Sequence, residues 1–136
     1  MLFKRAALKS EKWKVKGLMD SRAHRKLDVW KLSMDFVKEL YKITGKFPVS
    51  ETYGLSSQIR RAAISIPSNL AEGAARKGTK EFKQFLNIAQ GSISELDTQI
   101  ELSLSLDYID EEKHAELIEK INVISKMLYG LSRSIK

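Results

Sequence analysis

The sequence predicts an all-α protein, an antiparallel up-down four-helix bundle that follows a short basic extension. Apolar residues recur every three or four positions in four successive segments, which is the spacing of amphipathic helices. Short turns with Gly, Pro or Asp separate these segments, and the last segment keeps an almost perfect heptad spacing. Sustained heptads joined by short turns indicate neighbouring antiparallel helices that cross at about 20°.

Residues 1–22 are predicted to be a basic, flexible extension, and residues 23–136 to be the bundle. The net charge of +7 lies wholly within residues 1–26, so the remainder of the chain carries no net charge. The extension has no sustained helical periodicity. A solvated tail is the favoured interpretation, and an extension of the start site ahead of Met19 is the alternative.

The first predicted helix covers residues 24–44 and carries two apolar stripes, which indicates burial on more than one side. Gly45 and then Pro48 predict its end, with Gly45 as the glycine that follows a helix. One stripe contains Leu27, Trp30, Met34, Val37 and Tyr41; the other contains Val29, Leu32, Phe36, Leu40 and Ile43.

The second predicted helix runs to about Arg76, with Ser50 as its N-cap and Glu51 in its first turn. The third covers residues 80–106, capped by Thr79, and Gly91 within it is predicted to pack closely against a neighbouring helix. Asp110 is expected to cap the fourth helix. The heptad positions of that helix are Leu117, Ile121, Ile124, Leu128, Leu131 and Ile135.

The second helix divides into three faces when residues are placed at about 100° intervals. A core face contains Leu55, Ile59, Ala62, Ile66 and Leu70, and a polar stripe lies beside it. The third face is small and apolar where a monomer would be solvated, which predicts self-association; high helix propensity of alanine is the alternative reason. The predicted oligomer interface comprises Arg60, Ala63, Ile64, Pro67, Ala71 and Ala74.

Pro67 lies inside this second helix, where its missing N–H and its ring disturb the preceding turn. Either one helix bends at Pro67 or two helices meet there. A new helix would need Ile66 as its N-cap, which is a poor cap, so a kink at Pro67 is the favoured interpretation.

Arg60 and Arg61 point about 100° apart, so they do not form one clamp. One hypothesis pairs them with carboxylates such as Glu95 or Asp97 on the third helix; the other places them on the phosphates of a nucleic acid. The nucleic-acid hypothesis also includes the basic residues of the extension and of the helix ends. Its candidates are Lys12, Lys14, Lys16, Arg22, Arg25, Lys26, Arg60, Arg61, Arg76 and Lys77.

The sequence has no pattern of catalytic residues, and a non-enzymatic protein without cofactor or metal is expected. It contains no cysteine, which excludes disulfides and thiolate metal sites. His24 and His114 each lack a second ligand at helical spacing, and no phosphate-binding glycine loop is present. With no secretory signal and no apolar run long enough to span a membrane, a cytoplasmic location is expected.

Several stretches resemble the bacterial four-helix bundle proteins of the 23S rRNA intervening-sequence type. The resemblance covers about residues 24–135, and its longest motif is QIRRAAISIPSNLAEG at 58–73. Shorter matches are LDVW at 27–30, FP at 47–48, YGL at 53–55, KEF at 80–82, FLNIAQGSISELDTQ at 85–99 and MLYGL at 127–131.

The resemblance implies an up-down bundle that assembles as a homopentameric ring. A related protein, the accessory variability determinant of diversity-generating retroelements, is a basic pentamer that binds nucleic acid and a reverse transcriptase. By resemblance, this chain is therefore expected to bind RNA or DNA, or to scaffold a nucleic-acid enzyme. The alternative is a structural or protein-interaction oligomer in which the arginines serve subunit assembly. The uncharged bundle departs from the basic pattern of that relative.

Overall fold

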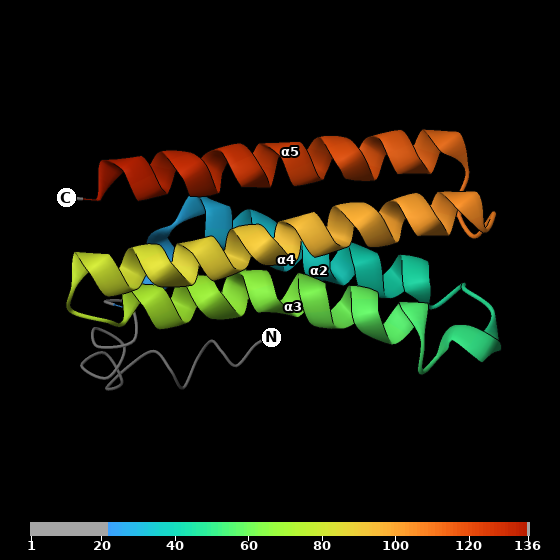
Figure 1. The fold of residues 1–136 in the computed structure, drawn as a ribbon, viewed down its shortest axis with the longest axis horizontal. Helices are drawn as coiled ribbons and strands as arrows, with labels where there is room; N and C mark the ends of the chain where they lie inside the picture. The colour runs from blue at the N-terminus through green and yellow to red at the C-terminus, as the bar shows by residue number, and fades with distance from the viewer. Residues whose placement is uncertain (1–21, 136) are drawn as a thin grey trace, which may run out of the picture.

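The computed structural model describes residues 22–135 of the chain. Figure 1 shows four long helices lying side by side, with their connections at alternate ends of the bundle. The part of the chain that is described contains only helical elements, so the predicted all-α four-helix protein is confirmed. The elements are η1 (Ala23–Lys26, a 3-10 helix), α2 (Asp28–Thr44), η2 (Val49–Glu51, a 3-10 helix), α3 (Leu55–Ala74), α4 (Thr79–Ser105) and α5 (Glu111–Ser134).

One hydrophobic core runs through the bundle, and each long helix contributes one buried stripe to it. Leu40, Ile66, Leu96 and Leu128, one from each helix, are almost completely buried. Burying a side chain of this size stabilises the fold by about 1.5–3 kcal/mol. Helix α3 packs most extensively on α4, whereas α2 and α5 touch only sparsely.

The first helix begins later than predicted but ends at Thr44, as predicted. The chain forms the 3-10 turn η1, becomes extended at Leu27, and only then enters α2. Gly45 follows the last residue of α2, as predicted, but its φ of −63° and ψ of −17° are not the left-handed conformation of a glycine at the C′ position. Any residue can adopt this right-handed conformation.

The predicted cap Ser50 is wrong, because α3 begins at Leu55 rather than near residue 51. Residues Val49–Glu51 form the separate turn η2. The Glu51 carboxylate reaches forward from this turn and accepts the Leu55 N–H at 2.9 Å. Glu51 therefore caps the first turn of α3 from outside the helix, which the spacing of cap residues alone does not reveal.

Helix α3 continues through Pro67, so the model with two separate helices is wrong. At its other end Gly73 is buried, and a Cβ there would lie 2.9 Å from atoms of Phe82 and Phe85 on α4. Gly91 is instead exposed, with no other atom within 4 Å of a Cβ built on it. The close helix contact is therefore made at Gly73, and its prediction at Gly91 is wrong within the subunit.

The starts of α4 and α5 show one wrong and one correct cap. Thr79 is the first residue of α4, and Gly78 precedes it without a side-chain cap. Asp110 caps α5 as predicted, with its carboxylate accepting the Lys113 N–H at 2.8 Å. The heptad residues Leu117, Ile121, Ile124 and Leu128 are buried, and Leu131 and Ile135 pack partly against the core. Across residues 22–135, no helix is both long and apolar enough to cross a membrane.

Candidate nucleic-acid interface and assembly surface

Five of the predicted nucleic-acid contacts lie exposed at one end of the bundle. Arg22, Arg25 and Lys26 belong to η1 and its flank, while Arg76 and Lys77 follow the end of α3. η1 packs against the C-terminal half of α3, where a hollow of about 680 Å³ is lined by Arg22, His24 and residues of α3 from 68 to 75. The fold thus gathers basic residues that are some fifty positions apart in sequence.

Lys80 and Lys83 reach the same end and were not among the predicted contacts. The turn between α3 and α4 is only a few residues long, so the start of α4 lies beside the end of α3. Lys80 is exposed and Lys83 is half-buried. The sequence does contain a signal for these two lysines. Because the turn at Lys77–Gly78 is short, the start of the next helix must lie beside the predicted contacts Arg76 and Lys77.

The charge of Arg76 is partly engaged within the subunit. Its guanidinium pairs with Glu72 at 2.9 Å and lies 5.1 Å from the centre of the Phe85 ring. Both partners are exposed, so the pair is screened by water and contributes little to stability. The guanidinium also keeps donors that face solvent, which suits a contact with a phosphate.

His24 sits at the basic end in an environment that disfavours its charged form. Its ring meets the Trp30 ring edge-on, with centroids 5.1 Å apart. Partial burial lowers the pKa of His24, and the neighbouring Arg25 and Arg22 lower that pKa further. The imidazole is therefore neutral at pH 7 and adds a hydrogen-bonding group, rather than a charge, to this surface.

Arg60 is engaged within the subunit rather than presented to solvent. Its Nε donates to Thr44 Oγ1 at 2.8 Å, and a terminal nitrogen donates to the Tyr41 carbonyl at 3.1 Å. Both acceptors belong to the last turn of α2, so Arg60 joins α3 to the end of α2. Neither predicted role, pairing with helix-three carboxylates or binding phosphate, includes this contact.

Arg61 is exposed, and within residues 22–135 its side chain forms no hydrogen bond or ion pair. It lines a small hollow of about 100 Å³ together with Gln58, Ser65 and Glu95. Among the described residues no ion pair joins Arg61 to Glu95 or Asp97, so the predicted pairing is wrong. Ser65 is bound instead by Ser92 of α4, with the two hydroxyl oxygens 2.7 Å apart.

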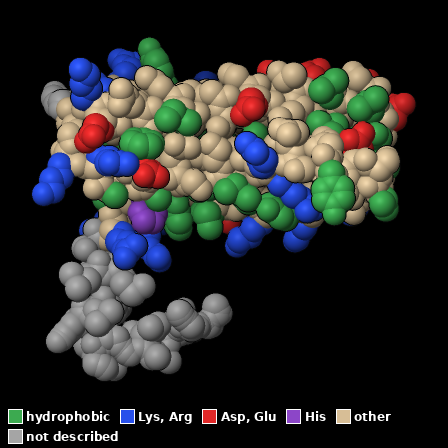
Figure 2. Space-filling model, turned by 60° about the horizontal axis from the view of Figure 1, so that its bottom comes forward, with side chains coloured by type: hydrophobic (Ala, Val, Ile, Leu, Met, Phe, Trp, Pro, Cys, Tyr) green, Lys and Arg blue, Asp and Glu red, His purple; other side chains and the backbone are tan. Residues whose placement is uncertain are grey.

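The predicted contacts do not form one continuous patch. Arg60 lies in α3 and Arg76 lies just beyond its end, 16 positions later. Along a helix axis this separation corresponds to about 24 Å. Figure 2 shows Lys and Arg side chains spread over this face between acidic and hydrophobic ones. Lys12, Lys14 and Lys16 lie outside the described residues.

The apolar third face of α3 is largely covered by the subunit itself. Ala63 and Pro67 are buried within the subunit, so one subunit does not present them on an open surface, and the oligomer interface stays a prediction. Ala71 and Ala74 are half-buried and line the hollow beside η1. Of the apolar candidates only Ile64, 41 % exposed, presents a large side chain to solvent. The sequence predicts an open face here because a helical wheel of α3 does not show that α2 and η1 pack against it.

A more exposed apolar surface lies at the opposite end of α3, where sequence reasoning predicted the start of a helix. Val49 and Tyr53, in and beside η2, are 87 % and 95 % exposed. Such exposure of two large apolar side chains close together is typical of a contact surface for another molecule. The real start of α3 at Leu55 leaves both residues in a loop.

The fold defines a class of protein: a small four-helix bundle with a basic end and with two exposed apolar side chains, Val49 and Tyr53, at the other end. Within the described residues, no group of His, Cys, Asp and Glu is arranged to hold a metal ion. The family model for 23S rRNA-intervening sequence proteins matches residues 25–130, so the chain belongs to that family.

A solved structure shares this fold. It is the crystal structure of a protein with unknown function from the S23 ribosomal protein family of Bacteroides thetaiotaomicron VPI-5482. The two chains are 25 % identical, the TM-score is 0.70, and the match covers 78 % of this chain and 99 % of the other. No curated protein matches the sequence.

Proposed function

We propose that this protein is a non-enzymatic oligomer that binds RNA through the basic end of its bundle. The supporting observation is the convergence of η1, the end of α3 and the start of α4, which places Arg22, Arg25 and Lys26 near Arg76 and Lys77. Family membership supports an association with 23S rRNA intervening sequences.

Charge neutralisation tests the basic end. We expect the full-length protein to bind a fluorescently labelled intervening-sequence RNA with an affinity that falls steeply as salt rises, since phosphate contacts release counterions. The triple variant Arg22→Gln/Arg25→Gln/Lys26→Gln should bind more weakly and with a shallower salt dependence. Fluorescence anisotropy at several salt concentrations measures both quantities.

The matched control removes three exposed charges elsewhere. Lys38→Gln/Lys42→Gln/Lys126→Gln has the same net charge as the first variant but changes the outer faces of α2 and α5. Equal weakening by both variants would show that only net charge matters and would contradict a defined interface. Absence of salt-sensitive binding in the unaltered protein would contradict the RNA function altogether.

A second candidate function is a protein-interaction oligomer without a nucleic-acid role, which the exposed Val49 and Tyr53 favour. Light scattering of the purified protein, with and without RNA, separates the two candidates. We propose five subunits, as the family resemblance implies. A particle of stable mass that RNA leaves unchanged supports the second candidate, and a monomer contradicts the oligomer in both.

The finer geometry of the bundle belongs to the same proposal. We propose that the four helices run antiparallel in up-down order, supported by connections at alternate ends (Figure 1). We further propose that α3 bends at Pro67, because a proline inside a helix removes one hydrogen bond and crowds the preceding turn. A crystal structure would show a straight axis through residues 63–70 if the bend is absent.

A further inference from the structure

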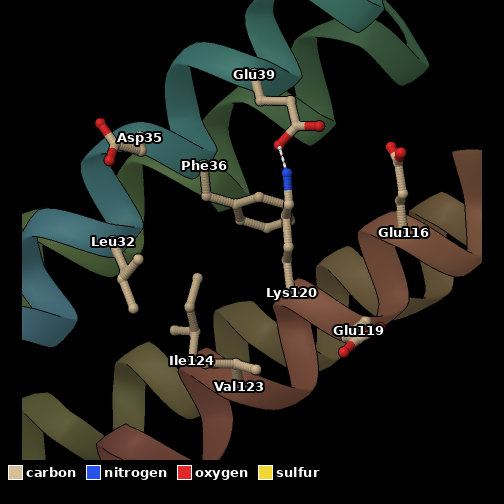
Figure 3. A pocket seen from close by; sticks show the side chains of 9 residues that line it. All are labelled: Leu32, Asp35, Phe36, Glu39, Glu116, Glu119, Lys120, Val123 and Ile124. Atoms are coloured by element: carbon tan, nitrogen blue, oxygen red, sulfur yellow. Dashed lines mark hydrogen bonds and ion pairs between the residues drawn. The ribbon is translucent and has the colours of Figure 1, made fainter.

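A groove of about 460 Å³ lies between α2 and α5, the pair of helices that touches only sparsely. In Figure 3 Leu32 from α2 and Ile124 from α5 point toward each other across the gap, and the Phe36 ring from α2 points into it. Leu32 and Val123 are 42 % and 43 % exposed, although both lie beside the core. The groove therefore has an apolar floor that the described part of the chain leaves open.

The rim of this groove is acidic. Asp35, Glu39, Glu116 and Glu119 line it, against one lining cation, Lys120. Lys120 pairs with Glu39 at 2.6 Å across the groove, as Figure 3 shows, and Lys113 pairs with Glu116 at 2.8 Å. Among residues 22–135, no ion pair occupies Asp35 or Glu119. An apolar floor with an acidic rim suits a basic segment that carries large apolar side chains.

We propose that the chain's own segment KWKVK, residues 12–16, docks in this groove. In an extended segment alternate side chains point to opposite sides, so Trp13 and Val15 can face the apolar floor together. Lys12, Lys14 and Lys16 then lie at the solvent side, where their long stems reach the carboxylates of the rim. The same five residues thus supply both kinds of side chain that the groove requires.

The length of the connecting chain allows this docking. Trp13 lies nine positions before Arg22, and nine extended residues span up to about 30 Å. Arg22 stands six positions before Asp28, ahead of the turn η1, and Phe36 lies eight residues after Asp28, about 12 Å along the axis of α2. Leu32 lies earlier in α2 than Phe36 and Glu39, so the Leu32 end of the groove is the end nearer to the segment in sequence.

Trp13 provides a direct test in the full-length chain. The protein has no cysteine, so Asn122→Cys gives a single position on α5, beside Val123, for a bimane label. Bimane fluorescence is quenched by a nearby tryptophan. Replacing Trp13 by Phe removes the quencher but keeps an aromatic side chain for the groove. We expect the fluorescence of the Asn122→Cys label to rise in the Trp13→Phe background.

Two controls separate docking from general effects. Gln58→Cys places the same label on the exposed side of α3, and its fluorescence should not change with Trp13→Phe. Reversing two rim charges with Asp35→Lys/Glu119→Lys should release the segment and raise the fluorescence of the Asn122→Cys label. The pair Glu95→Lys/Asp97→Lys on α4 changes the net charge equally and should leave that fluorescence unchanged.

Three results would overturn the proposal. The first is an Asn122→Cys label that does not respond to Trp13→Phe, and the second is an equal response at Gln58→Cys. The third is loss of quenching when the labelled chain is mixed with excess unlabelled Trp13→Phe chain, which would assign the segment to the groove of a second copy. These readouts contain no RNA, so their failure is independent of the proposed RNA function.

Discussion

Arg60 of α3 clamps Thr44, the last residue of α2, through a 2.8 Å hydrogen bond from Nε to the threonine hydroxyl. That hydroxyl in turn donates to the Leu40 carbonyl at 2.7 Å. The guanidinium also lies 4.3 Å from the centre of the Tyr41 ring. A cation at this position satisfies a carbonyl at the helix end and opposes the negative end of the helix dipole. Arg60 therefore ties two helices together.

Removing this contact should destabilise the fold. We expect Arg60→Ala to lower the free energy of unfolding by about 1–3 kcal/mol, since it loses hydrogen bonds from a charged donor. Arg61→Ala, which changes the exposed neighbour, should alter it by less than about 0.5 kcal/mol. Urea unfolding at one protein concentration measures both, because assembly makes stability depend on concentration. Equal losses in the two variants would contradict the structural role of Arg60.

Gly73 and Gly91 should respond in opposite directions to the same substitution. Gly73→Ala forces a methyl group against Phe82 and Phe85 at 2.9 Å, which should cost about 1–3 kcal/mol of stability. Gly91→Ala meets no atom within 4 Å in the subunit and should stabilise the helix by up to about 1 kcal/mol. Thermal and urea unfolding compare the two. A stabilised Gly73→Ala variant would show that α3 and α4 are not packed closely there.

The Glu51–Tyr108 contact should be visible as a pH effect. The Leu55 N–H and then the Tyr108 hydroxyl, which donates to Glu51 at 2.8 Å, hold the pKa of Glu51 below its usual range. The contribution of this carboxylate to stability is thus present above the ordinary value near 4.5 and is lost as pH falls through the lowered pKa. We expect Tyr108→Phe to raise the pKa of Glu51 only part of the way to its ordinary value, because the hydrogen bond from the Leu55 N–H, the larger cause, remains. A ¹³C NMR titration of the Glu51 carboxylate measures this.

Tyr108 should show the complementary shift at alkaline pH. The bond to Glu51 raises the pKa of Tyr108, since losing the phenolic proton would place two negative charges together. This contribution to stability is present below the ordinary value of 10.0 and is lost as pH rises through the raised pKa. Replacing Glu51 by Gln should return the ultraviolet titration of Tyr108 toward the other tyrosines. An unchanged titration would exclude the contact.

His24 should titrate below the usual pKa of 6.5 because it is partly buried beside Arg25 and Arg22. The folded state then takes up a proton less readily than the unfolded state, so stability is full above pH 6.5 and declines as pH falls through the lowered pKa. Arg25→Gln should raise the pKa of His24, although burial keeps it below 6.5. An NMR titration of the imidazole measures this shift, and an upward displacement from 6.5 in the unaltered protein would contradict the described surroundings.

Helical periodicity predicted the helices of the bundle well. It predicted less well which side chains are exposed on the surface. The heptad from Leu117 to Leu128 and the Asp110 cap are local features, so the sequence was enough to place them. Ala63 and Pro67 were assigned to an exposed face because a helical wheel does not show that a neighbouring helix covers two sectors. The role of Glu51 was missed for a similar reason, since its partner Tyr108 is 57 positions away.

The sequence by itself determined the all-helical fold, the end of the first helix at Thr44 and the concentration of basic residues before residue 27. These depend on periodicity and composition, which are properties of neighbouring residues. Only the tertiary structure decided that Arg60 is engaged with Thr44 while Arg61 is exposed, and that η1 meets the end of α3. Adjacent arginines point in different directions on a helix, so the packing of α2 on one side alone gives them different environments.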